Sequence, residues 1–326
     1  MNKMTRRGAL KPGAGLMAGS MTGLPLTAAA RTRLTLATGG TGGSTYQIGA
    51  GMARILAEKM SDTQATAQVT GGSIDNVKLI ASGDADFGFS TLDAALQGMN
   101  GIGPFKAEGK LDVRVIILLF DILVHVVASR SANVRSIADM RGKRISVGST
   151  GSATETIADN ILAAAGLNPA TDILRENIGG NESAAALQDG KIAAFFFVTG
   201  VGSSAVRELA ISGRPPLLFV PTNRELEVLA KKFPGQYRPF GLEPNAYPGI
   251  TQRVPSIGVP NVMITSGKTP DKLVTSVLET LFGNLEAVQA SHPDARRLSL
   301  ATSGSRVAVP FHPAAEAFYK ARGVLK

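Results

Sequence analysis

A glycine-rich turn follows the first predicted strand and leads directly into a helix. Residues 34–37 alternate apolar and small or polar side chains, as a short strand does. The next stretch, 38–46, carries four glycines among threonine and serine residues. Apolar residues between 48 and 56 then recur at helical spacing. We therefore predict a strand, a glycine-rich turn and a helix over 34–56.

This turn has the chemistry of a site for an anionic oxygen. Glycines let a ligand approach the main chain closely, and the first turn of a helix carries unpaired N–H groups with a partial positive charge. Thr41, Ser44 and Thr45 add hydroxyl donors. We expect a carboxylate or a phosphate to bind here. The alternative, on this stretch alone, is a tight strand-to-helix connection without a ligand.

Two nucleotide-binding motifs do not fit this turn. A P-loop places a lysine followed by Ser or Thr after its second glycine, and no lysine lies between Leu34 and Glu58. A dinucleotide-binding turn needs the spacing G-x-G-x-x-G, which Gly40, Gly42 and Gly43 do not provide. We therefore favour a small anion held by backbone amides.

Length and charge limit the class of protein further. The 326 residues, 44% of them hydrophobic, are enough for a large core and for two lobes. The net charge is +9. The first thirty residues contain four lysines and arginines and no acid, so the remaining residues carry a net charge of +5. This distribution argues against a nucleic-acid partner and suits the attraction of anionic ligands. The absence of cysteine excludes disulfides, thiolate metal sites and a lipoprotein anchor.

The first thirty residues have the features of an export signal. Paired arginines at 6–7 precede a weakly apolar run at 16–26, and residues 28–30 are alanines suited to cleavage. The arginine pair resembles the twin-arginine (Tat) type, although Ala9 stands where that pattern prefers Phe. The apolar run is too short to span a bilayer, which takes about 20 residues. We predict export by the Tat or the Sec route, cleavage near Ala30 and a periplasmic protein.

The sequence of strand, small-residue turn and helix start recurs further along the chain. A predicted strand at 64–69 leads into a helix start at 71–76, and a strand at 87–90 leads into one at Thr91. A strand at 142–148 leads through 149–154 into a helix. In an open α/β sheet such strand ends face the ligand crevice. The turn at 149–154 repeats the first turn at 38–46, and we expect these two turns to face each other across two lobes and to hold both ends of one small anion.

The remaining elements are predicted from periodicity and from turn residues. The strands are 113–119, 123–128, 192–198, 217–220 and 257–265, and the helices are 134–140, 155–165, 181–190, 205–210, 225–232, 271–290 and 314–322, with an irregular stretch at 237–249. His125 lies within a strand-like run, and the other two histidines are distant and show no ligand spacing. We expect His125 in the core or the crevice wall rather than as a metal ligand.

The candidate ligand-binding residues stand at these turns and strand ends. They are Thr41, Gly42, Gly43, Ser44, Tyr46, Ser73, Asn76, Thr91, Ser149, Thr150, Gly151, Ser152, Thr154, Gly200 and Tyr247. Their hydroxyls and amides can satisfy a carboxylate without a buried arginine. For Ser73 and Asn76 the alternative role is to cap a helix, and for Tyr247 it is to be a half-buried loop residue. We predict no metal and no cofactor.

Four stretches together resemble the TAXI family of solute-binding proteins, which serve TRAP transporters. They are TGGSTYQIG at 41–49, GSIDN at 72–76 with ASGDAD at 81–86, GSTGSATE at 148–155, and YPG at 247–249 with 254–263 and HPAAE at 312–316. Each stretch alone is a weak signal, but their order and spacing are specific. The resemblance covers nearly the whole chain after the export signal.

The resemblance implies an α/β, two-lobed fold like the type II periplasmic binding proteins, with two crossover hinge strands. These strands would cross near 120–127 and 258–264. Lobe 1 is then 31–119 plus 263–326, and lobe 2 is 120–262.

The resemblance also implies an extracytoplasmic receptor that binds a small organic anion between its lobes. Glutamate, 2-oxoglutarate and other dicarboxylate-like compounds are the expected ligands. The partner would be an ion-driven TRAP membrane permease with fused small and large subunits, and the receptor a monomer. The chain departs from the family at Thr45, where a second aromatic residue is usual, at Thr91, where Gln is, and at Thr150, where Pro is. These departures leave the exact ligand open.

Two other classes of function were weighed. A periplasmic sensor for a signalling partner needs the same ligand chemistry, so the sequence does not separate it from a transport receptor. An enzyme needs a base, a nucleophile or a metal, and the chain has no cysteine, no clustered histidines and no G-x-S-x-G motif. Asp84 and Asp86 follow a predicted helix end and read as a loop. We therefore predict a binding protein and not an enzyme.

Overall fold

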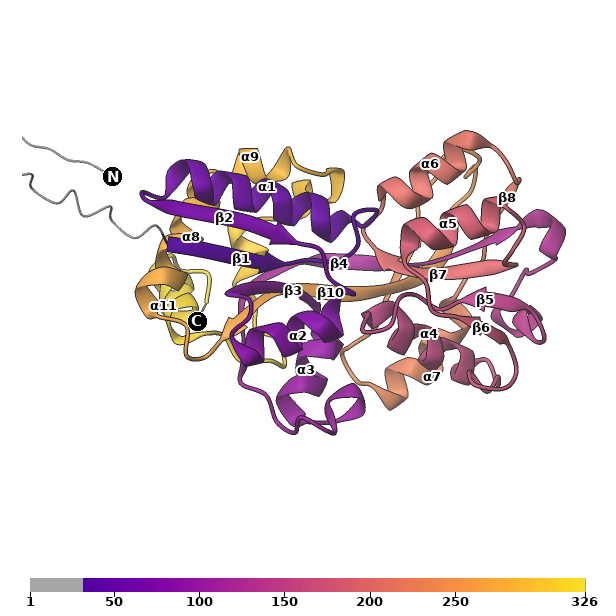
Figure 1. Ribbon diagram of the computed structural model, residues 1–326, viewed down its shortest axis with the longest axis horizontal. Helices are drawn as coiled ribbons and strands as arrows, with labels where there is room; N and C mark the ends of the chain where they lie inside the picture. Colours follow the sequence, from indigo (N-terminus) through magenta and orange to yellow (C-terminus); the bar gives the residue numbers. More distant parts are fainter. Residues whose placement is uncertain (1–31, 326) are drawn as a thin grey trace, which may run out of the picture. The chain divides into compact units, whose positions relative to one another are not determined.

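Two long strands lie side by side in the middle of the part of the chain that the computed structural model describes, residues 32–325 (Figure 1). They are β4 (Val113–Ser129) and β10 (Val254–Ser266), and they run antiparallel. Almost every residue of β4 is buried, as in strands covered on both faces. The apolar runs predicted at 113–119 and 123–128 are therefore one strand. The predicted export signal at 1–30 lies outside the described residues.

One group of strands pairs with the carboxyl-terminal half of β10. Strand β3 (Phe87–Thr91) runs antiparallel to β10, and β1 (Thr32–Ala37) lies parallel between β3 and β2 (Thr63–Gln68). The turns after these parallel strands are consequently at one end of the sheet, where ligand sites form in α/β folds.

A second group of strands pairs with the carboxyl-terminal half of β4. Strand β7 (Ala194–Thr199) runs antiparallel to residues 123–128 of β4, and β5 (Arg144–Ser146) lies parallel between β7 and β6 (Leu174–Glu176). Strand β8 (Leu217–Phe219) pairs antiparallel with the last residues of β4, and β9 (Arg238–Leu242) pairs antiparallel with the start of β10.

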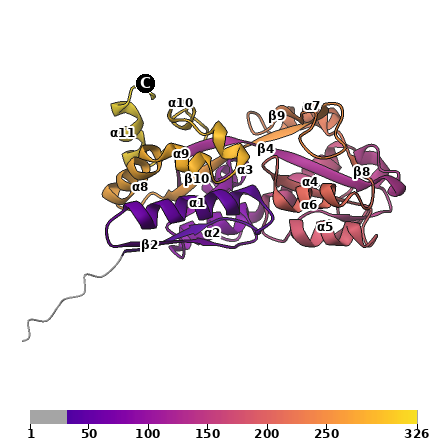
Figure 2. The same ribbon diagram turned by 90° about the horizontal axis from the view of Figure 1, so that it is seen from above.

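Strand β10 thus pairs with β3 of the first group and with β9 of the second, while β4 pairs with β10 and with β7 and β8 of the second group. The two groups lie at opposite ends of β4 and β10 in both views (Figures 1 and 2). We propose the lobe boundaries predicted above. Lobe 1 is 31–119 plus 263–326, lobe 2 is 120–262, and β4 and β10 are the crossover strands.

Helices cover both faces of the sheet in each lobe, as their buried apolar stripes require. In lobe 1, α1 packs with α8 and α9, while α2 and α3 pack together on the other face (Figure 1). In lobe 2, α5 packs with α6, and α4 packs with α7. The lobe 1 helices are α1 (Ser44–Lys59), α2 (Ser73–Ser82), α3 (Leu92–Asn100), α8 (Asp271–Gly283), α9 (Leu285–Gln289), α10 (Leu300–Ser303) and α11 (Pro313–Ala321). The lobe 2 helices are α4 (Ala153–Ala164), α5 (Gly180–Gln188), α6 (Ser204–Ser212) and α7 (Asn223–Lys232).

Several predicted elements differ from the observed ones. The helix predicted at 271–290 is two helices, because Asn284 interrupts it and caps α9. The irregular stretch 237–249 contains β9, and the short strand β6 had no prediction. The helix predicted at 134–140 is only a 3-10 turn at Ile137–Met140, and α4 begins two residues before the predicted Glu155. Three further 3-10 turns are Gly103–Phe105, Arg130–Ala132 and Pro293–Arg297.

Candidate functional site

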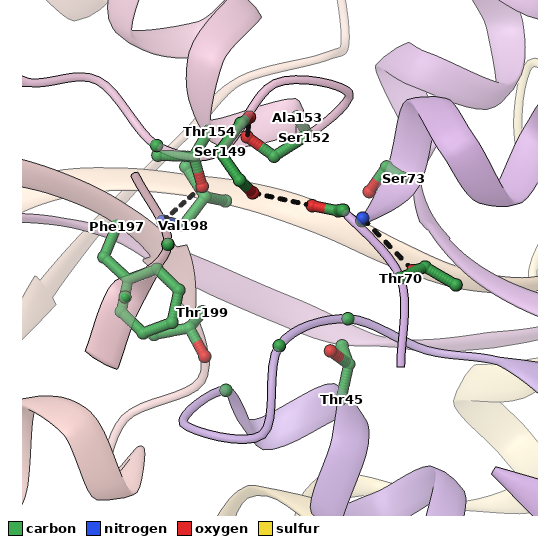
Figure 3. Close-up of a pocket in the computed structure, with 18 of the residues that line it drawn as sticks. Thr45, Thr70, Ser73, Ser149, Ser152, Ala153, Thr154, Phe197, Val198 and Thr199 are labelled. Atoms are coloured by element: carbon green, nitrogen blue, oxygen red, sulfur yellow. Dashed lines mark hydrogen bonds between the residues drawn. The ribbon is translucent and has the colours of Figure 1, made fainter. Parts of the chain in front are cut away.

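A cavity of about 320 Å³ lies between the two lobes. This volume is at the lower end of the range for small-molecule sites. Its wall comes from the turns that start helices in both lobes and from four strands, β3, β4, β7 and β10. Figure 3 shows Thr45, Thr70 and Ser73 of lobe 1 opposite Ser149, Ser152 and Thr154 of lobe 2.

The wall is rich in hydroxyl groups and glycine. No lysine or arginine is among its residues, and Glu182 is the one charged side chain among the described residues that line it. The lining residues are Thr38, Gly39, Gly40, Gly43, Thr45, Val69, Thr70, Gly71, Gly72, Ser73, Phe89, Thr91, Ile122, Gly148, Ser149, Ser152, Ala153, Thr154, Gly179, Gly180, Glu182, Phe197, Val198, Thr199 and Asn261.

The amino-terminal ends of five helices contribute to this wall. Lobe 1 provides Thr45 of α1, Ser73 of α2 and the cap of α3 at Thr91. Lobe 2 provides Ala153 of α4 and Gly180 of α5. The first amides of a helix have no partner within it and carry a partial positive charge. The convergence of five such ends can therefore attract an anion without a cationic side chain.

At α1, the amide of Ser44 is already in use. It donates a 3.1 Å hydrogen bond to Thr199 Oγ1 of lobe 2, and Ser44 Oγ accepts a 2.8 Å bond from the Gly200 amide. Ser44 is fully buried. The start of α1 thus binds lobe 2 through Ser44 and faces the cavity through Gly43 and Thr45.

At α2, the helix cap is Gly72, whose φ of 127° lies in the left-handed region that favours glycine. Ser73 is therefore the first helical residue rather than the cap, and its Oγ accepts a 3.0 Å bond from the Thr91 amide. The amides of Ile74 and Asp75 both donate to the carbonyl of Gly151 in lobe 2 at 3.1 Å.

At α4, Ser152 is the helix cap, as its side chain accepts a 3.1 Å bond from the Glu155 amide. Its hydroxyl donates 2.7 Å to the carbonyl of Ser149. Ser149 Oγ in turn donates 3.0 Å to the carbonyl of Gly71 in lobe 1 (Figure 3). The turn between β5 and α4 is therefore held in shape and joined to lobe 1 at the edge of the cavity.

The lobes also meet through residues that do not line the cavity. The Val201 amide donates 2.7 Å to Asp294 Oδ2, and the Ala205 amide donates 3.3 Å to the carbonyl of Gly42. Burial raises the pKa of Asp294, against the smaller opposite effect of the nearby Arg297. The hydrogen bonds between the lobes, both at the cavity wall and away from it, indicate that the two lobes are closed.

Six of the fifteen predicted residues line the cavity. They are Gly43, Ser73, Thr91, Ser149, Ser152 and Thr154. The structure therefore brings together residues from lobe 1 and lobe 2, which the sequence separates widely.

The other nine predicted residues do not line the cavity. They are Thr41, Gly42, Ser44, Tyr46, Asn76, Thr150, Gly151, Gly200 and Tyr247. Most have another use: Gly42, Ser44, Gly151 and Gly200 bond across the lobes, and Thr41 Oγ1 accepts 3.0 Å from Asn181.

Asn76 has a structural role that the sequence did not reveal. Its side chain is fully buried and its amide donates to three carbonyls, those of Ala37, Thr38 and Phe89. Its Oδ1 accepts 2.7 Å from Thr70 Oγ1. Asn76 therefore ties the ends of β1 and β3 to the start of α2 rather than facing the cavity.

Tyr247 lies in the core of lobe 2 next to His125. The Gly202 amide donates 2.8 Å to Tyr247 Oη, and Tyr247 Oη lies 2.9 Å from His125 Nε2. His125 Nδ1 lies 3.3 Å from the Phe197 carbonyl, so Nδ1 carries the proton and Nε2 accepts from the phenol. Burial lowers the pKa of His125 to about 4 and raises that of Tyr247 to about 12. His125 thus lies in the core and not in the cavity wall, which were the two locations predicted for it.

Sequence reasoning missed the start of α5 and the strand residues Thr199 and Asn261 as cavity residues. The glycine pair at 179–180 before a predicted helix was the available signal for α5. Asn261 is a polar residue in the middle of an apolar strand, which was the signal for that position.

Within residues 32–325, no group of three or more His, Cys, Asp or Glu side chains could hold a metal ion, and no helix is long and apolar enough to cross a membrane.

A comparison with protein-family models matches residues 36–323 to the model described as the NMT1-like family. The chain belongs to the NMT1-like family. This assignment is coarser than the TAXI resemblance, which remains a prediction.

Solved structures similar to this NMT1-like protein include periplasmic proteins. A structure described as a periplasmic transporter has a TM-score of 0.53 and 14% identity, over 90% of this chain and 93% of that one. A protein of Bordetella bronchiseptica RB50 has a TM-score of 0.53 and 15% identity, over 91% and 90%. The alkanesulfonate-binding protein SsuA of Xanthomonas axonopodis pv. citri has a TM-score of 0.50 and 14% identity, over 92% and 96%. The predicted two-lobed fold of the type II periplasmic binding proteins is confirmed.

Proposed function

We propose that this NMT1-like protein is an extracytoplasmic solute receptor that binds one small organic anion between its lobes and delivers it to a membrane permease. The carrying observation is the cavity itself, where five helix ends and a ring of hydroxyls meet without a lysine or arginine. Amide and hydroxyl donors satisfy a carboxylate and also allow its release, because no ion pair has to be broken.

Binding and closure are coupled in this proposal. Both lobes contribute donors, so a ligand makes its full set of contacts only when the lobes are closed, and it therefore shifts the population toward the closed state. A permease can then distinguish the loaded receptor from the empty one by its closed arrangement.

We further propose that the receptor is of the TAXI type and serves a TRAP permease with fused subunits, as a periplasmic monomer exported by the signal at 1–30. The four sequence stretches described above support this subclass. The expected ligands are glutamate, 2-oxoglutarate or another dicarboxylate-like compound.

Alkanesulfonates are a second class of ligand to test, because one structural neighbour is described as an alkanesulfonate-binding protein bound to MOPS. A sulfonate head group also needs several hydrogen-bond donors. The cavity volume of about 320 Å³ favours a small ligand of either class.

A thermal-shift screen tests this proposal. The panel contains dicarboxylates, keto acids, amino acids and alkanesulfonates, with matched amides and alcohols as uncharged controls. A ligand at 100 times its Kd stabilises the native state by about 2.7 kcal/mol, which raises the Tm on the order of 5 °C for a protein of this size. We expect at least one carboxylate to do so while its amide does not. Stabilisation only by uncharged or cationic compounds would overturn the proposal.

A further inference from the structure

Two buried polar groups of the cavity wall have no hydrogen-bond partner. They are Asn261 Nδ2 and Thr91 Oγ1. The side chains are 1% and 2% exposed, and both residues line the cavity. Buried polar groups in native proteins are almost always paired, so unpaired ones in a cavity wall are groups that a ligand can pair.

The fold places these two groups opposite each other. Asn261 on β10 pairs in register with Thr91 on β3. On its other side, the register of β10 against β4 shifts between Pro260 and Val262, which leaves Asn261 at an irregularity of the ladder. Such bulges re-aim side chains and are frequent next to functional sites.

The surroundings of this pair differ from the rest of the wall. The other wall residues from strands β3, β4 and β10 are Phe89 and Ile122, which are apolar. We call these four residues the strand wall: Phe89, Thr91, Ile122 and Asn261. The Thr91 hydroxyl also lies near the buried carboxylate of Asp93, without a hydrogen bond of normal geometry. A polar pair in an apolar wall can select one polar group of a ligand.

Asn76 provides an internal comparison. It is as deeply buried as Asn261, yet both ends of its amide are hydrogen-bonded within the protein. The side-chain amide of Asn76, which has a structural role, is therefore fully hydrogen-bonded within the protein. The unpaired Nδ2 of Asn261 has no such structural use.

We propose that Asn261 and Thr91 form a second subsite, which donates hydrogen bonds to a carbonyl or carboxylate oxygen at the end of the ligand away from the starts of α4 and α5. This inference rests on the proposed function and makes it more specific. The ligand then carries two oxygen-bearing ends, one at the starts of α4 and α5 and one at the strand wall, as a dicarboxylate or an oxo acid does. An acid with an apolar chain would leave the Asn261 amide unpaired.

The test compares glutarate with pentanoate, in which a methyl group replaces the second carboxylate, by calorimetry on wild type and on Asn261→Leu. We expect wild type to bind glutarate at least tenfold more tightly than pentanoate. Pentanoate offers no acceptor to the buried donors of the subsite, and leaving them unpaired weakens its binding. Asn261→Leu should bring the ratio of the two affinities close to one, because it weakens the binding of glutarate. Asn100→Leu, the same change at an exposed asparagine, should leave the ratio as in wild type.

Thr91→Val and Thr91→Ser provide a second, smaller change at the same subsite. The valine variant should reduce the ratio and the serine variant should restore it, which a purely structural role would not do. A glutarate-to-pentanoate ratio near one in wild type, or a ratio unchanged in Asn261→Leu and Thr91→Val, would overturn this inference and leave the proposed function standing. Failure of wild type to bind any acid of the thermal-shift panel would instead overturn the proposed function.

Discussion

Ser149 Oγ donates a 3.0 Å hydrogen bond to the carbonyl of Gly71, a residue 78 positions earlier in the chain. The bond joins the β5–α4 turn of lobe 2 to the turn before α2 of lobe 1. Because the bond joins the two lobes, it can form only when they are closed. Its free energy therefore stabilises the closed state and, through it, ligand binding. Both residues also line the cavity, which places this bond at its edge.

Replacement of Ser149 by alanine should therefore weaken ligand binding more than it lowers stability. The loss of one such hydrogen bond amounts to about 1 kcal/mol, or about fivefold in Kd. Calorimetry with the strongest ligand of the thermal-shift panel measures the change, and Ser82→Ala at an exposed serine is the control. An unchanged Kd would show that this bond does not contribute to the closed, ligand-bound state.

Gly200→Ala should act as a wedge between the lobes. A Cβ atom at Gly200 would lie 2.3 Å from Asp294 Oδ2 and 2.7 Å from Ser44 Oγ, both in lobe 1. We expect affinity to fall at least tenfold, and small-angle X-ray scattering with ligand to give a larger radius of gyration than wild type. Gly283→Ala, where a Cβ meets nothing within 4 Å, is the matched control. Equal behaviour of the two variants would contradict the contact between the lobes at Gly200.

Asn76→Ala should destabilise the fold. The change leaves the buried carbonyls of Thr38 and Phe89 without their donor, which costs about 2–4 kcal/mol in the free energy of unfolding. Denaturant unfolding measures this cost. Normal stability with lost ligand affinity would show instead that Asn76 acts on the ligand, as the sequence suggested.

Acid should destabilise the protein through His125. Its pKa is lowered by burial from 6.5 to about 4, so the folded state holds the neutral ring. This contribution to stability is fully present above pH 6.5 and is lost as the pH falls toward 4, because the unfolded chain binds the proton first. Between pH 7.5 and 5 the loss is about 2 kcal/mol.

The measurement is the free energy of unfolding of wild type and His125→Gln at both pH values. The glutamine side chain does not titrate, so His125→Gln should lose less stability than wild type on acidification. The same acid dependence in both proteins would assign it to other groups, His292 among them, whose pKa burial also lowers.

Local sequence was sufficient to predict the turns that begin α1, α2 and α4, because glycine spacing and small polar residues act within a few residues of chain. It also predicted a strand at 257–265, within β10, but it divided β4 into two strands at 113–119 and 123–128. The exact ends of elements depended on tertiary contacts, as the interruption at Asn284 and the short β6 illustrate.

The identity of the cavity-lining atoms could not be predicted from local sequence. Ser44 and Gly151 have the right chemistry and stand in the right turns, but their groups are consumed by hydrogen bonds between lobes. These bonds depend on how the lobes close, which no local pattern encodes. Asn261 reaches the cavity only because β10 pairs with β3 and shifts its register against β4.

The most direct measurement is a crystal structure of the protein grown with the strongest ligand of the panel. We predict electron density for one small anion in the cavity. Its carboxylate should lie within hydrogen-bond distance of the first amides of α4 or α5 and, on the other side, of Thr45 or Ser73. An anion bound outside this cavity, or one contacting residues of a single lobe, would contradict the account.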